Sequence, residues 1–180
     1  MRKIYLLLLS LILLPYGMRA ETGDFNVTGS GSYSYSEGVL TVNDGADITL
    51  SMVGGATEPT SDRIVVAANA TATITLNGVS ITGPGPDISS VAPAQSAIDV
   101  GENAHLILNL SDNKNKTLTG GSGGTDLGAP GIHVSSSASL VVQGSGGLSV
   151  QGGSSTTTYG GKGIGGKPNT QQSGGPCGTV

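Results

Sequence analysis

The chain has little of what many catalytic and binding sites are built from. Among its 180 residues are one cysteine, two histidines, no tryptophan and 3% aromatics. The single cysteine, Cys177, excludes an internal disulfide, and one cysteine with two histidines excludes a zinc site made of four such ligands. We therefore expect Cys177 to be a buried small residue or half of a pair with another chain.

Charged residues are also scarce, at 11% of the chain, and the net charge is −4. Arg2 and Lys3 precede an apolar run over residues 4–14, which is typical of a secretory signal peptide over residues 1–20. That run is too short to span a bilayer, which needs about 20 residues. Cleavage near Ala20 leaves 5 basic against 12 acidic residues, a net charge of −7. This balance argues against nucleic-acid binding, which needs clustered Lys and Arg, and we expect no membrane insertion after cleavage.

After residue 20 the chain lacks the apolar spacing of amphipathic helices and instead repeats a short apolar cassette. Ile64-Val65-Val66 is followed 34 residues later by Ile98-Asp99-Val100, after another 34 by Ile132-His133-Val134, and after 32 by Ile164. The pattern continues after each isoleucine. Eight residues later come Ala72, Leu106 and Leu140, and ten residues later come Ile74, Leu108 and Val142. Twelve residues later come Leu76, Leu110 and Gly144. An earlier unit fits the same offsets with Leu40, Val42, Ile48, Leu50 and Met52.

A period near 34 residues, made of short alternating segments joined by glycine-rich connectors, predicts an all-β solenoid, the parallel β-helix. One unit buries about six apolar side chains, each contributing roughly 1.5–3 kcal/mol. Ordering the backbone costs roughly 1–2 kcal/mol for every residue of the unit. A single unit, or rung, therefore cannot fold alone, and the rungs must stack.

The predicted organisation has four parts: a signal peptide over residues 1–20, an N-terminal lead-in or cap over 21–38, rungs over 39–161, and a glycine-rich tail or start of a further rung over 162–180. The lead-in is expected to supply one or two strands that cover the first rung. The four rungs are expected at 39–61, 62–95, 96–129 and 130–161. Turn chemistry is expected to break the strands at 83–86, 120–124 and 152–155.

Outward positions of the first strand in each rung form the column Val65, Asp99, His133 and Gly165. Adjacent rungs lie about 4.8 Å apart, so Asp99 and His133 are predicted to be neighbours. They fit a general acid/base pair or a solvated cross-rung charge ladder. Because no nucleophile or pocket accompanies them, no catalytic residue is assigned.

Outward positions of the second strand form two polar columns, Thr71, His105 and Ser139, and Thr75, Asn109 and Gln143. Hydroxyls and amides at the sheet spacing can hydrogen-bond along a polysaccharide, or they can form an ordinary solvated surface. The candidate carbohydrate-binding residues are Thr75, Asn109, Gln143, His105, Asp99 and His133. A shallow groove or a row of exposed aromatics would favour binding, and a uniformly polar surface would favour a spacer.

No cofactor and no metal ligand is assigned, although two loops carry acids that calcium accepts. These are Asp44 with Asp47, and Asp112 with Asn113 and Asn115. Neither follows the EF-hand spacing, and Asx turns explain both loops. Lys114 and Lys116 flank the second loop and are expected to be solvated.

The repeat resembles secreted bacterial carbohydrate-binding β-helix domains and related adhesin-like repeat proteins over about residues 39–166. The segments that carry the resemblance are Ile64 to Ile81, Ala97 to Val100 with Leu106-Ile107-Leu108, Gly131 to Val134 with Leu140-Val141-Val142, and Gly163-Ile164-Gly165-Gly166. The resemblance implies a right-handed parallel β-helix outside the cell or on its surface. It also implies polysaccharide binding in some members and calcium sites in some.

The expected function is therefore a non-catalytic, secreted or cell-surface carbohydrate-binding or adhesin-like module. A pectin-lyase-like enzyme is one alternative, but it needs a Lys or Arg base beside several calcium-binding acids. The mature chain has one arginine, Arg63, with Ala97 and Gly131 at the matching positions of the next rungs. A ligand-free structural spacer is the other alternative. Residues 178–180 are predicted to open a further strand at an exposed sheet edge, covered by more rungs or by a partner.

Overall fold

The computed structural model describes residues 22–86, 93–124, 127–156, 159–167 and 177–180. The expected signal peptide, residues 1–20, lies outside this part. The described residues form an all-β structure whose one helical turn is the 3-10 element η1 (Val53–Gly55). They contain no helix with the length and hydropathy of a membrane span.

The strands form three sheets. Sheet I has the order β1 (Phe25–Ser30), β4 (Asp47–Met52), β6 (Thr71–Leu76), β9 (His105–Leu110) and β12 (Ser139–Gly144). Sheet II has the order β14 (Ile164–Gly165), β11 (Ile132–Val134), β8 (Ile98–Val100), β5 (Arg63–Val66), β3 (Val39–Val42) and β2 (Tyr33–Ser36). Sheet III has the order β13 (Leu148–Gln151), β10 (Lys116–Thr119) and β7 (Ser80–Thr82).

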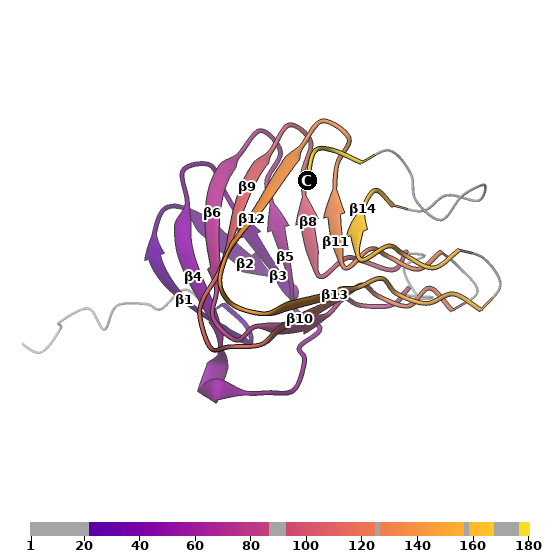
Figure 1. The fold of residues 1–180 in the computed structure, drawn as a ribbon, viewed down its shortest axis with the longest axis horizontal. Coiled ribbons are helices and arrows are strands. Elements are labelled where there is room, and N and C mark those ends of the chain that lie inside the picture. Colours follow the sequence, from indigo (N-terminus) through magenta and orange to yellow (C-terminus); the bar gives the residue numbers. More distant parts are fainter. Residues whose placement is uncertain (1–21, 87–92, 125–126, 157–158, 168–176) are drawn as a thin grey trace, which may run out of the picture.

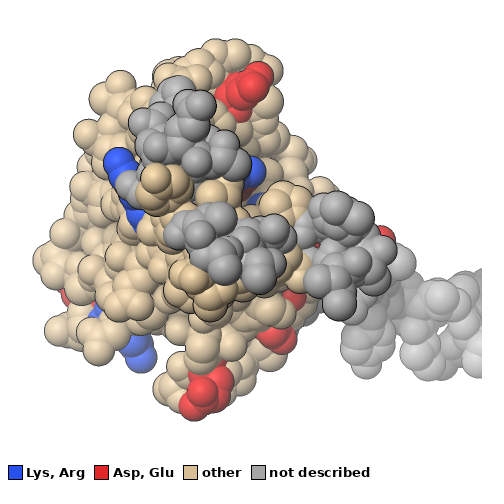
Figure 2. Space-filling view, turned by 90° about the vertical axis from the view of Figure 1, so that its right-hand side faces the viewer, with Lys and Arg blue, Asp and Glu red and all other residues tan. Residues whose placement is uncertain are grey.

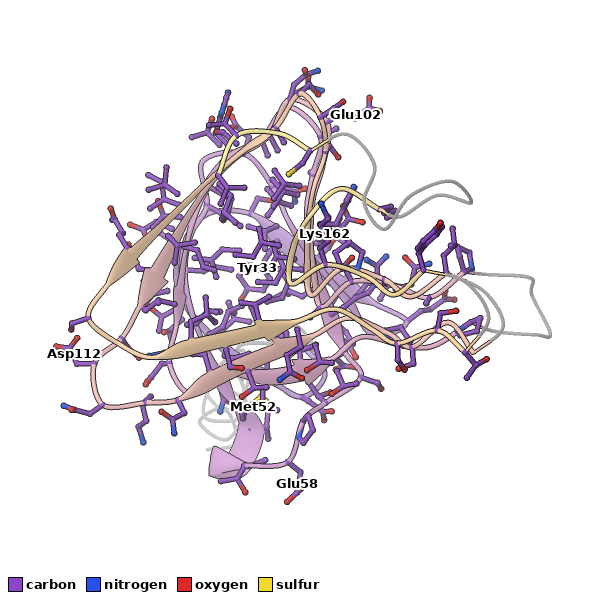
Figure 3. All side chains as sticks on the ribbon, turned by 45° about the vertical axis from the view of Figure 1, so that its right-hand side comes forward. Tyr33, Met52, Glu58, Glu102, Asp112 and Lys162 are labelled. Atoms are coloured by element: carbon purple, nitrogen blue, oxygen red, sulfur yellow. The ribbon has the colours of Figure 1, made fainter. Side chains whose placement is uncertain are left out.

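The three sheets are the walls of a common interior (Figure 1). In Figure 3, side chains fill the space between the walls, and Glu102 and Asp112 lie at two of the corners. Strands β3 to β14 pair in parallel with the equivalent strand of the next unit. From β5 onward, successive strands along the chain belong to sheets II, I and III in a repeating order.

The predicted 34-residue register is confirmed between β5, β8 and β11 and between β6, β9 and β12. Ile64 pairs with Ile98, and Ile98 pairs with Ile132. All three side chains have 0% exposure. Alternation along each strand places these β-branched side chains inside, where they stack on one another from strand to strand.

The register predicted for the first unit is wrong by two residues in β4. Ile48 was expected beside Ala72, but it pairs with Ile74. Met52 lies opposite Phe25 of β1. Four residues separate β3 from β4, as they separate β5 from β6, but Asp47 at the start of β4 lies opposite Thr73 rather than Thr71. A two-residue shift leaves every side chain on the same face of the sheet. The apolar pattern therefore could not reveal it.

Two antiparallel strands cover the first unit. Strand β1 pairs with β4, and β2 pairs with β3. Phe25 is buried beneath them, and the Tyr35 hydroxyl donates a hydrogen bond to Asp62 Oδ2 at 2.8 Å. Their reversed direction ends the series of parallel strands and covers what would be an exposed sheet edge.

The opposite end of the stack leaves β12 largely uncovered. Val142 lies in the same inward column as Leu108, yet it is 37% exposed whereas Leu108 is 0% exposed. Thr179 forms an isolated parallel bridge with Ser139, at the place where a further strand was predicted to open. Cys177 was expected to be a buried small residue or half of a pair with another chain, and it is exposed near this bridge, so the first alternative is wrong.

The glycine-rich connectors between sheets III and II form projecting arms that pack backbone against backbone (Figure 1). The amide of Gly121 donates to the Gln95 carbonyl at 2.9 Å, and the amide of Gly153 donates to the Ala129 carbonyl at 2.8 Å. Gly121 and Gly153 are not in the left-handed region. They are glycines because a side chain would collide with a neighbouring backbone, which differs from the turn chemistry expected of these segments.

Lys116 was expected to be solvated, but its side chain is 1% exposed. It occupies an inward position at the start of β10, because Thr117 faces outward and strand alternation places its neighbour inside. Its Nζ donates to the carbonyl oxygen of Ser111 at the adjacent corner. Burial lowers the pKa of the Lys116 ammonium, and the nearby charge of Asp112 opposes this effect.

Candidate functional site

Three of the predicted carbohydrate-binding residues lie in one column on the outer face of sheet I. Thr75 pairs with Asn109, and Asn109 pairs with Gln143. The Asn109 amide donates to Thr75 Oγ1 at 3.5 Å, and the Gln143 amide donates to Asn109 Oδ1 at 2.7 Å. The column is therefore a hydrogen-bonded ladder across β6, β9 and β12.

The ladder uses only part of the hydrogen-bonding capacity of the two amides. Each amide carries two N–H donors and one carbonyl acceptor. The internal bonds occupy one N–H of each residue and the Asn109 carbonyl. The Gln143 carbonyl and one N–H of each amide can bind a ligand, and the ladder holds both side chains in position for it.

The predicted histidine of this face is also paired across the strands. His105 Nδ1 and Ser139 Oγ are 2.6 Å apart, and both residues are outward partners of the same register. His105 thus lies on the same wall as the Asn109–Gln143 ladder, four residues along β9. The wall has a polar column at each side.

Between the two polar columns lies an aliphatic column that the sequence interpretation missed. Thr73 pairs with Ile107, and Ile107 pairs with Val141, all at outward positions. Val141 is 51% exposed. The signal was present in the runs Leu106-Ile107-Leu108 and Leu140-Val141-Val142, where every position is apolar although only alternate positions face the core. This outer face of β6, β9 and β12, which we call the sheet I face, is therefore apolar in its middle and polar at its sides.

Asp99 and His133 lie on a different wall, the outer face of sheet II. They are direct partners, and His133 Nδ1 donates to Asp99 Oδ1 at 2.7 Å. Lys167 Nζ lies 3.5 Å from Asp99 Oδ2. The six predicted carbohydrate-binding residues therefore belong to two surfaces, with Thr75, Asn109, Gln143 and His105 on one and Asp99 and His133 on the other.

Neighbouring charges stabilise the ionised form of Asp99 in the Asp99–His133 pair, which we call the sheet II pair. Burial raises the pKa of the Asp99 carboxyl, but the hydrogen bond and charge of His133, with the charges of Lys167 and Arg63, outweigh it, so this pKa is below its ordinary value. Burial lowers the pKa of the Arg63 guanidinium, and Asp99 opposes that shift. Asp99, His133 and Lys167 therefore form a charge ladder between adjacent units, and the charge of Arg63 acts on Asp99 from the neighbouring strand.

Replacing Asp99 by Asn is expected to lower the free energy of unfolding by about 1–2 kcal/mol at neutral pH, since the negative charge that strengthens the hydrogen bond from His133 is removed. A lowered carboxyl pKa stabilises the fold above the unfolded value of about 3.9 and stops doing so as the pH falls through the folded value. Urea unfolding should therefore show a lower free energy of unfolding for D99N than for wild type at pH 7, and this difference should disappear near pH 2. A difference of the same size at both pH values would contradict this assignment.

A groove of about 580 Å³ continues the sheet I face at the corner between sheets I and III. It lies between the η1 loop and the starts of β7 and β10, and Figure 3 shows Met52 between the wall that contains β10 and the loop that carries Glu58. Its polar lining consists of Asn26, Ser51, Thr57, Asn77, Ser80, Lys114, Asn115 and Thr117. We call it the corner groove.

The corner groove follows directly from the strand register. Ser51 and Asn77 each lie two positions beyond the paired residues Thr49 and Thr75, so they continue the outward side of β4 and β6. Ser80 pairs with Thr117 on the outer face of sheet III. The sequence interpretation missed this site because its residues come from four separate segments around one corner.

One acid in each of the two loops considered for calcium accepts a hydrogen bond within the fold. Asp44 Oδ1 accepts the backbone amide of Thr71 at 2.8 Å. Asp112 accepts the hydroxyl of Ser145. Across the described residues, no three His, Cys, Asp or Glu side chains are grouped so that they could hold a metal ion. Charged side chains are also sparse on the surface shown in Figure 2, where they form separated spots.

No family model, curated protein or solved structure matches the chain. The resemblance to carbohydrate-binding β-helix domains therefore stays a prediction, and functional inference depends on the two surfaces described above.

Proposed function

We propose that this chain is a non-catalytic, secreted or cell-surface module that binds polysaccharide. In this proposal the mature chain is a right-handed parallel β-helix of about four rungs that follows a signal peptide. The three parallel walls and the 34-residue register support the β-helix. The apolar run near the N-terminus supports export.

The observation that carries the binding proposal is the composition of the sheet I face. Ile107 and Val141 form an aliphatic column beside the Asn109–Gln143 ladder. A sugar ring has apolar C–H groups on its faces and hydroxyls around its rim, so it can bury the first against aliphatic side chains and bond the second to amides. The spacing of about 4.8 Å between strands lets a chain of sugars cross several of them.

The corner groove favours binding over the spacer alternative. A spacer requires only a solvated surface, whereas this molecule has a groove of about 580 Å³ that continues the sheet I face. Ser51, Ser80 and Thr117 line it, and their hydroxyls make no hydrogen bond within the described residues. Their donors and acceptors can therefore be satisfied by the hydroxyls of a bound glycan.

The enzyme alternative has less support. A pectin-lyase-like mechanism needs a base beside several calcium-binding acids, and Arg63 has Asp99 as the acid that shifts its pKa. Asp99 is itself bonded to His133. We therefore propose a binding function without catalysis.

The test is a pull-down of residues 21–180 on a panel of insoluble and soluble polysaccharides, with and without calcium. For the polymer retained, the double variant N109A/Q143A should bind about tenfold more weakly, because two amide hydrogen bonds contribute about 0.5–1.5 kcal/mol each. Gln151→Ala is the matched control, since Gln151 is exposed on sheet III. Urea unfolding checks that each variant is folded.

Retention of no polysaccharide by the folded chain would contradict the proposed function. Equal binding by wild type and N109A/Q143A would instead place the glycan on another surface.

A further inference from the structure

We infer that the corner groove binds an anionic sugar, one that carries a carboxylate or a sulfate ester. This inference rests on the proposed function and names the class of glycan. Among the described residues, Lys114 is the one charged residue that lines the groove. The rest of this lining is uncharged: it combines apolar residues such as Met52 and Ala56 with the amide residues Asn26, Asn77 and Asn115, which can hydrogen-bond a sugar acid.

The backbone holds Lys114 over the groove. Asn113 has a φ of 56°, so the corner between β9 and β10 turns sharply at the residue before Lys114. Gly78 has a φ of 72°, and a Cβ there would lie 3.6–3.8 Å from the Cδ, Cβ and Cγ atoms of Lys114. The methylene groups of Lys114 therefore extend past Gly78, and both residues line the groove.

The charge of Lys114 is not used within the described residues. No carboxylate forms an ion pair with it, and it donates no hydrogen bond. Asp112, two residues earlier, accepts the Ser145 hydroxyl and is absent from the groove lining. An unpaired ammonium beside amides is a favourable partner for an anionic oxygen, because a bond between opposite charges is about twice as strong as a neutral one.

The neighbouring amides supply further donors to the same group. The Ser111 hydroxyl donates to the Leu76 carbonyl at 2.8 Å and lies 3.3 Å from Asn77 Oδ1. The two N–H donors of the Asn77 amide make no hydrogen bond within the described residues. Asn115 makes no hydrogen bond within the described residues. An ammonium and amide N–H groups all donate, so the group they share must be an acceptor, and an anion satisfies them best.

The experiment compares three polymers: a glucuronic-acid polymer, the same polymer with its carboxyl groups reduced to primary alcohols, and a sulfated neutral polymer. Wild type should bind a charged polymer about fivefold more tightly than the reduced polymer at low salt, and the difference should shrink at about 0.5 M salt as charges are screened. The charged polymer that binds more tightly identifies the anionic group.

Lys114→Gln should lose this preference and keep its binding to the reduced polymer. Lys162→Gln is the matched control, because Lys162 is exposed and lies on another side of the molecule from Met52 (Figure 3). Equal binding of charged and reduced polymers by wild type would overturn the inference while leaving the proposed function standing. If the folded chain bound none of these three polymers and no other polymer of the panel, the proposed function itself would be overturned.

Discussion

Leu108→Ala is expected to lower the free energy of unfolding by about 3 kcal/mol, which is typical for truncating a buried leucine. Leu108 has 0% exposure, and its register partners Ile74 and Val142 lie on either side of it. Removing its side chain leaves a cavity between two strands that are fixed by parallel pairing. Little relaxation can fill that cavity, because each strand is bonded to the next.

Val142→Ala is the matched control for this prediction. Val142 occupies the same column but is 37% exposed at the end of the stack, so its truncation is expected to cost about 1 kcal/mol or less. Urea unfolding with a common m-value measures both variants. Equal losses for the two would show that the inward column does not extend as a packed core from β6 to β12.

Gly121→Ala is expected to cost about 3 kcal/mol through overpacking. A Cβ on Gly121 would collide with the carbonyl oxygen of Pro84, which is backbone and cannot rotate away. The collision would also break the bond from the Gly121 amide to the Gln95 carbonyl. Urea unfolding gives the loss of stability, and hydrogen exchange at the Gly121 and Ala129 amides shows whether the arms open first.

Gly147→Ala separates packing from the general effect of removing a glycine. A Cβ on Gly147 would lie 3.6 Å from Asn115 Oδ1, which is an ordinary contact, and its φ is not in the left-handed region. Its change in stability is expected to stay within about 0.5 kcal/mol. If G121A were as stable as G147A, the arms would not be packed as described.

The inward columns could be predicted from the sequence because two constraints agree there. Alternation fixes which face each residue of β5, β8 and β11 takes, and the 34-residue spacing fixes which residues become neighbours. The β4 register could not be predicted, since a two-residue slip satisfies alternation equally well. The structure places Ile48 opposite Ile74, two residues beyond the partner that the repeat predicts.

The candidate site was predictable in part for a related reason. The outward partners Asn109 and Gln143 follow from the same register as the core. The corner groove does not, because its shape depends on how the η1 loop and the corners after β6 and β9 approach one another. Lys116 was predicted to be solvated because it is charged. Strand alternation places its side chain inside, where its ammonium donates to the Ser111 carbonyl, and it is buried.

Mapping the bound glycan onto the backbone amides by NMR tests the central claim most directly. With the polymer retained in the pull-down, the account predicts shift changes at Asn77, Asn109 and Gln143 and none at Asp99 or His133. Shift changes confined to the sheet II pair, or the absence of change with any polysaccharide, would contradict the claim that the sheet I face and the corner groove bind glycan.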